Sequence, residues 1–142
     1  MYISHQNPIG VVFSLNSDSN SLTSLLNSII QPLTVGCSVI SFSEESSIIA
    51  LKFAEDINNS DFPPGSLNIL SGQFEKIFED VSKHVEINLV SICKIIPNEI
   101  LKKIQENASS SVKRIINMPS EDGISSILPF LETKTVWHPK GT

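Results

Sequence analysis

The feature that most constrains the fold is a repeated alternation of short β-branched runs with longer segments whose apolar residues recur every three or four positions. This alternation is typical of βαβ units built around a parallel sheet. The predicted strands are 9–15, 37–42, 66–70, 87–92 and 112–117, and the predicted helices are 21–30, 45–57, 74–81, 97–104 and 124–131. The sequence therefore predicts an α/β fold with a parallel five-stranded sheet and helices on both faces.

Proline and glycine mark the expected ends of these elements. Pro32 is expected to end the first helix. The run Pro63-Pro64-Gly65 is expected to turn the chain from the second helix into the third strand, because proline has no amide hydrogen and cannot continue a helix. We expect residues 1–119 to form the body of the domain. Residues 120–142 are expected to add a short helix and an extended tail, in the same domain or at an interface.

Composition limits the classes of partner. A chain of 142 residues with 40% hydrophobic content can build one domain with a real core. Its formal charge of −5 opposes binding to a nucleic-acid backbone, and it has no apolar run of membrane-spanning length. The two cysteines lie far apart and residues 1–10 do not resemble a signal peptide. A reduced, cytoplasmic location is therefore expected, with neither nucleic acid nor membrane as a partner.

Several stretches match one protein family without gaps. These are "NPIGVVFSL", "IIQPLTVGCSVISFSEESSIIALKFAEDI" and "DFPPGSLNILSG", and the tail "GISSILPFLETKTVW" adds a further match. Through them the chain resembles the cofactor-binding domain of the NAD(P)-dependent aldehyde dehydrogenases. The likeness is strong over residues 7–72, weak over 73–118 and moderate over 123–139. It implies a Rossmann-like domain from which the catalytic domain is missing.

The same resemblance addresses cofactor binding. In the family, a Lys-Pro-Ser-Glu run after the second strand contacts the adenosine ribose. The aligned residues are Phe42-Ser43-Glu44-Glu45, which implies Glu45 as a cofactor-binding residue but replaces the lysine with Phe42. The family then uses glycines to approach the pyrophosphate, and none occurs here between Gly72 and Gly123. Lys94 could supply a compensating charge, although a lone lysine at a strand end is commonly solvated. No cofactor is expected, and NAD is expected over NADP if one binds.

Catalysis by this chain alone is not expected. The family's chemistry needs an activated cysteine, a general base and an oxyanion donor. The resemblance places the oxyanion asparagine at 17–19, where Ser-Asp-Ser stands with Asn20 one position off. It places the base near Met118, with Glu121 too far on, and it leaves no segment for the nucleophile. No residue is therefore assigned a catalytic role.

The remaining reactive side chains admit simple structural interpretations. Cys37 opens a strand and is expected in the core. Cys93, at the carboxyl end of the fourth strand, is either a structural residue or a reactive thiol. The three histidines share no metal-ligand spacing with either cysteine, so no metal site is expected.

The favoured hypothesis is a non-catalytic dehydrogenase-like module that acts in assembly or partner binding. It most resembles the degenerate C-terminal unit of the two-unit proteins in the family's sixteenth class. Thr135, Val136 and Trp137 are the expected interface, where the tail adds a strand to an exposed edge. Alternatively the tail covers its own sheet, with Trp137 in the core. Oligomerisation is expected, through self-association or docking on a longer dehydrogenase-like chain.

Two other functional classes stay open. One is an NAD-binding module whose catalytic domain lies on another chain or a removed part, which Glu45 and the first crossover favour. The other is a flavodoxin-like signalling domain. It is disfavoured because Asp18 stands alone after the first strand, where a phospho-acceptor site needs paired acidic residues.

Overall fold

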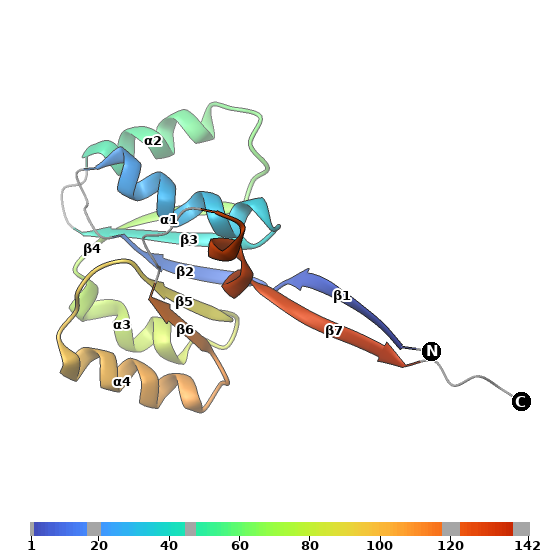
Figure 1. Cartoon of the computed structure of the whole chain (residues 1–142). Helices are drawn as coiled ribbons and strands as arrows, with labels where there is room; N and C mark the ends of the chain where they lie inside the picture. Colours follow the sequence, from blue (N-terminus) through green and yellow to red (C-terminus); the bar gives the residue numbers. More distant parts are fainter. Residues whose placement is uncertain (1, 17–20, 45–47, 118–122, 138–142) are drawn as a thin grey trace, which may run out of the picture.

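The chain folds into a helix-covered sheet from which a two-stranded ribbon projects (Figure 1). The computed structural model describes residues 2–16, 21–44, 48–117 and 123–137. The elements in order are β1 (Tyr2–Pro8), β2 (Val11–Leu15), α1 (Leu22–Thr34), β3 (Ser38–Glu44), α2 (Ile48–Asn58), β4 (Leu67–Gly72), α3 (Phe74–Lys83), β5 (Leu89–Ile92), α4 (Asn98–Ser109), β6 (Arg114–Asn117), the 3₁₀ helix η1 (Ile124–Phe130) and β7 (Leu131–Trp137).

The main sheet has five parallel strands in the order β4-β3-β2-β5-β6. Helices α1 and α2 cover one face and α3 and α4 cover the other (Figure 1). This arrangement confirms the predicted fold class. Because the strand order reverses between β2 and β5, the sheet has a switch point there, and in such sheets ligands bind at the carboxyl ends beside it.

Alternation along the central strands divides the core between the two faces. Phe13 and Leu15 of β2 pack with Phe42 and Phe74 toward α3 and α4, where the rings of Phe13 and Phe42 lie 6.0 Å apart. On the other face, Val12 packs with Cys37 and with Phe130 of η1. The expectation that Cys37 is a core residue is therefore confirmed, since it is 3% exposed.

Helix α1 begins with a capping serine and extends past the proline that was expected to end it. Its first turn is capped by Ser21, whose side chain accepts a hydrogen bond from Ser24 N at 3.2 Å. The prediction that Pro32 ends this helix was wrong, because the helix continues to Thr34 with Pro32 inside it. A proline in the last turn costs few helical hydrogen bonds, and the ring of Pro32 is buried in the core.

The ribbon pairs the two ends of the described chain. β1 and β7 are antiparallel, with Tyr2 opposite Trp137 and Pro8 opposite Leu131. No strand was predicted over the N-terminal residues. The alternative in which Trp137 packs in the core was wrong, because its side chain is 60% exposed and β7 pairs with β1 rather than with the main sheet. Among the helices that the structure describes, none has the length and apolar character needed to cross a lipid bilayer.

Candidate functional site

The candidate site, here called the crevice, is the edge of the sheet at the carboxyl ends of β2, β3 and β5, where ligands bind in sheets with a switch point. Parallel pairing continues past the strands on both sides of β2, since Asn16 N donates to Phe42 O and Cys93 N donates to Leu15 O, both at 3.0 Å. These bonds bring Asn16, Glu44 and Lys94 to the same edge of the sheet.

Asn16 is the centre of a buried polar network. It is 5% exposed, and its Nδ2 donates to Ser43 Oγ at 2.6 Å. Its Oδ1 accepts from Ser28 Oγ of α1, and its amide also lies within hydrogen-bond distance of Ser41 Oγ. Such a network is stabilising only when its members satisfy one another, as they do here. The side chain of Asn16 is therefore committed to holding α1 against the sheet.

Lys94 and Glu44 form an ion pair across the carboxyl end of β2. Lys94 Nζ pairs with Glu44 Oε1, although Lys94 follows β5 and Glu44 ends β3, on opposite sides of β2. The Lys94 side chain is only 19% exposed. The expectation that Lys94 is a solvated surface residue was therefore wrong. Its charge is already matched by a carboxylate, so a phosphate group would have to compete with Glu44 for it.

Cys93 directly precedes Lys94, and its surroundings disfavour the thiolate form. Its Sγ lies 4.0 Å from Ser14 Oγ and 3.8 Å from Ser91 Oγ, in hydrogen-bonding positions. Burial raises the pKa of the Cys93 thiol above its ordinary value, and the two serine contacts only partly oppose that effect. Because the thiolate is the nucleophilic form, the neighbourhood of Cys93 favours the structural interpretation over the reactive one.

Phe42, which stands at the position of the family's lysine, points into the core. Its side chain is 1% exposed and packs against Phe74 with ring centroids 6.0 Å apart. Alternation along β3 sends this position into the core, whereas Ser43 faces α1 and the Asn16 network. Phe42 is therefore a core residue of the sheet.

Several residues singled out in the sequence lie outside the described part of the chain. They are Glu45, Asp18, Asn20, Met118, Glu121 and His138. Within the described part, no group of three or more His, Cys, Asp or Glu side chains is placed to hold a metal ion. The described residues of the crevice also do not fit a pyrophosphate, because they offer no glycine beside β5 and one cation that is already paired.

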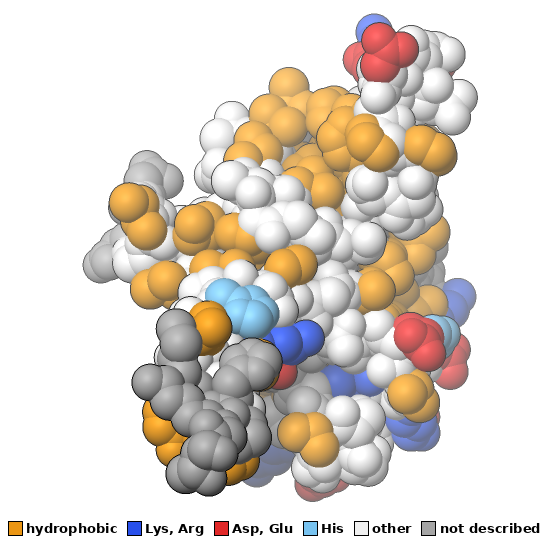
Figure 2. All heavy atoms as spheres, turned by 90° about the vertical axis from the view of Figure 1, so that its right-hand side faces the viewer, with side chains coloured by type: hydrophobic (Ala, Val, Ile, Leu, Met, Phe, Trp, Pro, Cys, Tyr) orange, Lys and Arg blue, Asp and Glu red, His pale blue; other side chains and the backbone are white. Residues whose placement is uncertain are grey.

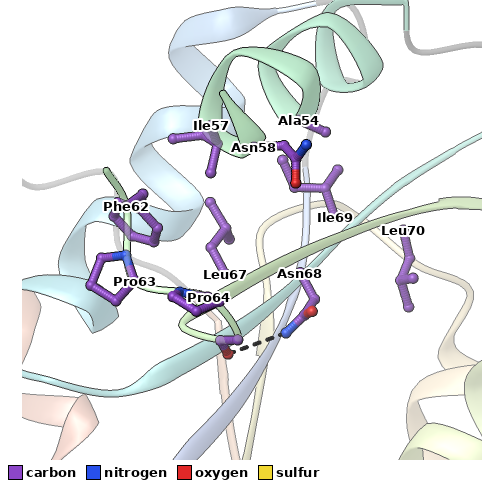
Figure 3. Close-up of a pocket in the computed structure, with 11 residues that line it drawn as sticks. Ala54, Ile57, Asn58, Phe62, Pro63, Pro64, Leu67, Asn68, Ile69 and Leu70 are labelled. Carbon is purple, nitrogen blue, oxygen red and sulfur yellow. Dashed lines mark hydrogen bonds between the residues drawn. The ribbon is translucent and has the colours of Figure 1, made fainter. Parts of the chain in front are cut away.

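A second concavity lies away from the crevice. It has a volume of about 390 Å³ and lies between α2, the loop after it and β4 (Figure 3). Its walls are mixed: Ile57 and Phe62 from the helix side and Leu67 and Ile69 from the strand are apolar, whereas Asn58 and Asn68 are polar. Asn68 is held beside it by a hydrogen bond from Nδ2 to Gly65 O at 3.3 Å.

The five-stranded order with a switch point defines a Rossmann-like domain. The model of the aldehyde dehydrogenase family matches residues 1–118, which is most of the chain, and the chain therefore belongs to that family.

Individual relatives agree with this assignment. The chain is 30% identical to the putative aldehyde dehydrogenase DhaS of Bacillus subtilis (strain 168) over 115 residues, which cover 80% of this chain and 23% of that one. A crystal structure of betaine aldehyde dehydrogenase from Staphylococcus aureus in complex with NAD⁺ is 25% identical with a TM-score of 0.71, covering 82% of this chain and 23% of that chain. An aldehyde dehydrogenase from Bartonella henselae is 26% identical with a TM-score of 0.66, covering 86% and 25%. The chain thus spans about a quarter of the length of these relatives.

Sequence reasoning missed the network of Asn16 and the pairing of Glu44 with Lys94. Asn16 directly follows an apolar strand, and a polar residue there was a usable signal. The ion pair had no such signal, because its members lie fifty positions apart and meet only through the strand order.

Proposed function

We propose that this chain is a non-catalytic member of the aldehyde dehydrogenase family that acts in assembly, in the cytoplasm, through its two-stranded ribbon. The observation that carries the proposal is a ribbon with apolar side chains at its tip, standing away from the body (Figure 1). An isolated pair of strands is marginally stable in water, so this ribbon needs a further surface to pack on.

The tip of the ribbon supports a protein interface. Tyr2 and Trp137 lie opposite each other and are 75% and 60% exposed, and Ile3 and Val136 form the next pair. Directly opposed residues share a face, so each face of the tip carries an apolar pair. Below the tip, Thr135 Oγ1 lies 2.8 Å from Ser4 Oγ, which fixes the register. Thr135, Val136 and Trp137 therefore remain the proposed interface, with a second copy or a longer dehydrogenase-like chain as the partner.

The non-catalytic part of the proposal rests on the surroundings of the two cysteines. Of the two cysteines, Cys37 is buried, and burial raises the pKa of the Cys93 thiol, which disfavours its thiolate form. The likeness to the degenerate C-terminal unit of the family's sixteenth class belongs to the same proposal.

Sedimentation velocity tests the assembly role. We expect the wild-type chain to self-associate with rising concentration and the double variant Val136→Ser, Trp137→Ser to remain a monomer. Ile95→Ser is the matched control, because Ile95 is a fully exposed apolar residue outside the ribbon. A wild-type chain that stays a monomer at high concentration would contradict self-association. If Ile95→Ser lost self-association as much as the double variant does, the ribbon would not be the interface.

A nucleotide-binding module is the second candidate, favoured by the switch point between β2 and β5 and by the NAD⁺ complex of the staphylococcal relative. Calorimetric titration with NAD and ADP-ribose separates the two candidates. The assembly proposal expects no heat of binding at millimolar ligand. Binding that is lost in Glu45→Ala and kept in the surface control Glu99→Ala would establish the nucleotide role, with Glu45 as its cofactor-binding residue.

A further inference from the structure

The edge strand β4 lacks two features that commonly protect a sheet edge, proline and charged side chains. It pairs with β3 alone among the described strands. Its sequence, LNILSG, contains no proline and no charged residue, which are the common devices against pairing with another chain. Val39 N donates to Ser66 O at 2.8 Å, so Ser66 faces β3. Because successive residues face opposite sides of a strand, the backbone groups of Leu67, Ile69 and Ser71 face outward.

Each face of β4 adjoins a hollow. On the α2 face lies the 390 Å³ concavity, into which Leu67 and Ile69 project (Figure 3). Leu70 points to the opposite face and is 47% exposed. On that opposite side, Gly65 and Asn68 border a second hollow of about 350 Å³, whose other lining residues are Val11, Ser38, Ile40, His84, Glu86 and Ile87. An added strand would lie beside Leu67 and Ile69 on one face of β4 and beside Leu70 on the other, and these side chains offer apolar contacts to alternate residues of that strand.

Charge selects the kind of segment that fits. The concavity of about 390 Å³ is flanked by three exposed acidic residues, Glu55 and Asp56 on α2 and Asp61 on the loop after it. Glu86 borders the second hollow, of about 350 Å³. Lys52 is the one cation in residues 48–66, which also carry these three acidic residues, so α2 and the loop after it are net acidic. Figure 2 shows hydrophobic side chains over the upper part of the molecule's face, with acidic and basic side chains together at the top.

We propose that the free edge of β4 binds an extended segment of a partner protein as a sixth strand, with apolar side chains at alternate positions and lysine or arginine beside them. The chain's own extended tail does not fill this place, because β7 is paired with β1. The proposed site lies apart from the ribbon and from the crevice, so it does not depend on either proposed role.

Fluorescence anisotropy with labelled peptides tests this site. The probe is a peptide of about eight residues, the length of an ordinary strand, that alternates valine with threonine and carries lysine at each end. A matched peptide carries glutamate at each end, and a third has alternate backbone amides methylated. We expect the lysine peptide to bind, the glutamate peptide to bind roughly tenfold more weakly because like charges meet, and the methylated peptide not to bind.

Variants place the binding on β4. Ser71→Pro removes one outward amide and should weaken the lysine peptide about fivefold, the effect of one lost hydrogen bond, whereas Ser71→Ala should bind like the wild type. Bound peptide should also slow amide exchange in β4. If Ser71→Pro does not fold, the methylated peptide still decides the outcome on the wild-type chain.

Three results would overturn the proposal. The first is no binding of the lysine peptide at millimolar concentration, and the second is equal binding of the methylated peptide. The third is protection of β4 amides that rises with protein concentration in the absence of peptide, which would assign the edge to a second copy of this chain. The ribbon variant Val136→Ser, Trp137→Ser should bind the peptide normally.

Discussion

At the scale of single residues, Gly10 connects the ribbon to the sheet. It has a φ of +123° between β1 and β2, and a Cβ added there would overlap Asn88 Oδ1. That oxygen accepts a hydrogen bond from Val11 N at 2.8 Å, so the overlap cannot be relieved without losing the bond. The glycine is thus required both by backbone conformation and by close approach.

Two glycine variants separate these requirements. Gly65 has a φ of +82° with open space around its position, so Gly65→Ala should cost only the backbone strain, about 1–2 kcal/mol. Gly10→Ala should cost at least about 1 kcal/mol more, since it also disturbs the bond between Asn88 and Val11. Urea unfolding of the two variants measures the difference. Equal losses would mean that Asn88 moves aside freely.

The thiol of Cys93 predicts a pH dependence of stability. Burial raises its pKa, so above the ordinary cysteine value of 9.0 the unfolded chain loses this proton before the folded chain does. The folded state then binds more protons, and its free energy of unfolding falls as pH rises. Below that pH the effect is absent. Cys93→Ala should lack this component of the alkaline fall.

The measurement is urea unfolding of both proteins at about pH 8 and about pH 10, on either side of the ordinary thiol pKa. Burial lowers the pKa of Lys113, which acts in the opposite direction over the same range. Lys113 is the same in both proteins, and its influence cancels in the difference. A Cys93→Ala curve parallel to the wild type would contradict the raised pKa.

At the scale of elements, helix α1 depends on its first turn. Ser21 satisfies the amide of Ser24, and no acidic residue lies in the first turn to assist it. Ser21→Ala should lower the free energy of unfolding by about 1 kcal/mol, and Ser21→Asp should retain or exceed wild-type stability because it caps and also meets the helix dipole. Thermal unfolding of the two variants checks this. A harmless Ser21→Ala would show that packing alone fixes the start of α1.

How far an element could be predicted depended on whether its signal was local. The parallel strands were found because each is a compact apolar run between turn residues, and Leu89–Ile92 is buried throughout. β1 was missed because Tyr2–Pro8 lacks the alternation of a half-buried strand and is mostly exposed. The prediction that Pro32 ends α1 was wrong because the helix tolerates this proline through the packing of its ring in the core, which the local sequence does not reveal. In the candidate site, the pairing of Glu44 with Lys94 needed the strand order, which no single stretch encodes.

At the scale of the whole molecule, the body and the ribbon differ in what stabilises them. The body has two apolar clusters, which include fully buried Phe13, Phe42, Phe74 and Phe130. The ribbon has side-chain bonds between exposed residues, such as Gln6 Nε2 to Thr133 Oγ1 at 2.8 Å, and its burial pattern is exposed along nearly all of both strands. The ribbon therefore has little apolar burial of its own.

This difference predicts two levels of amide protection. In a dilute, monomeric sample, amides of β1 and β7 should exchange by local opening, because little surface is buried when they pair. Amides of β2 and β5 should exchange only through global unfolding, as they lie in the centre of the sheet with both faces covered. Hydrogen exchange followed by mass spectrometry compares the two sets in one experiment.

Raising the protein concentration then links stability to assembly. If the ribbon packs on a second copy, its amides should gain protection with concentration while those of β2 and β5 change little. The variant Val136→Ser, Trp137→Ser should keep the fast exchange of the ribbon at every concentration, and Ile95→Ser should follow the wild type. If the ribbon amides in a monomeric sample were as protected as those of β2 and β5, the two strands of the ribbon would be stable without a partner. The apolar tip would then no longer require a partner.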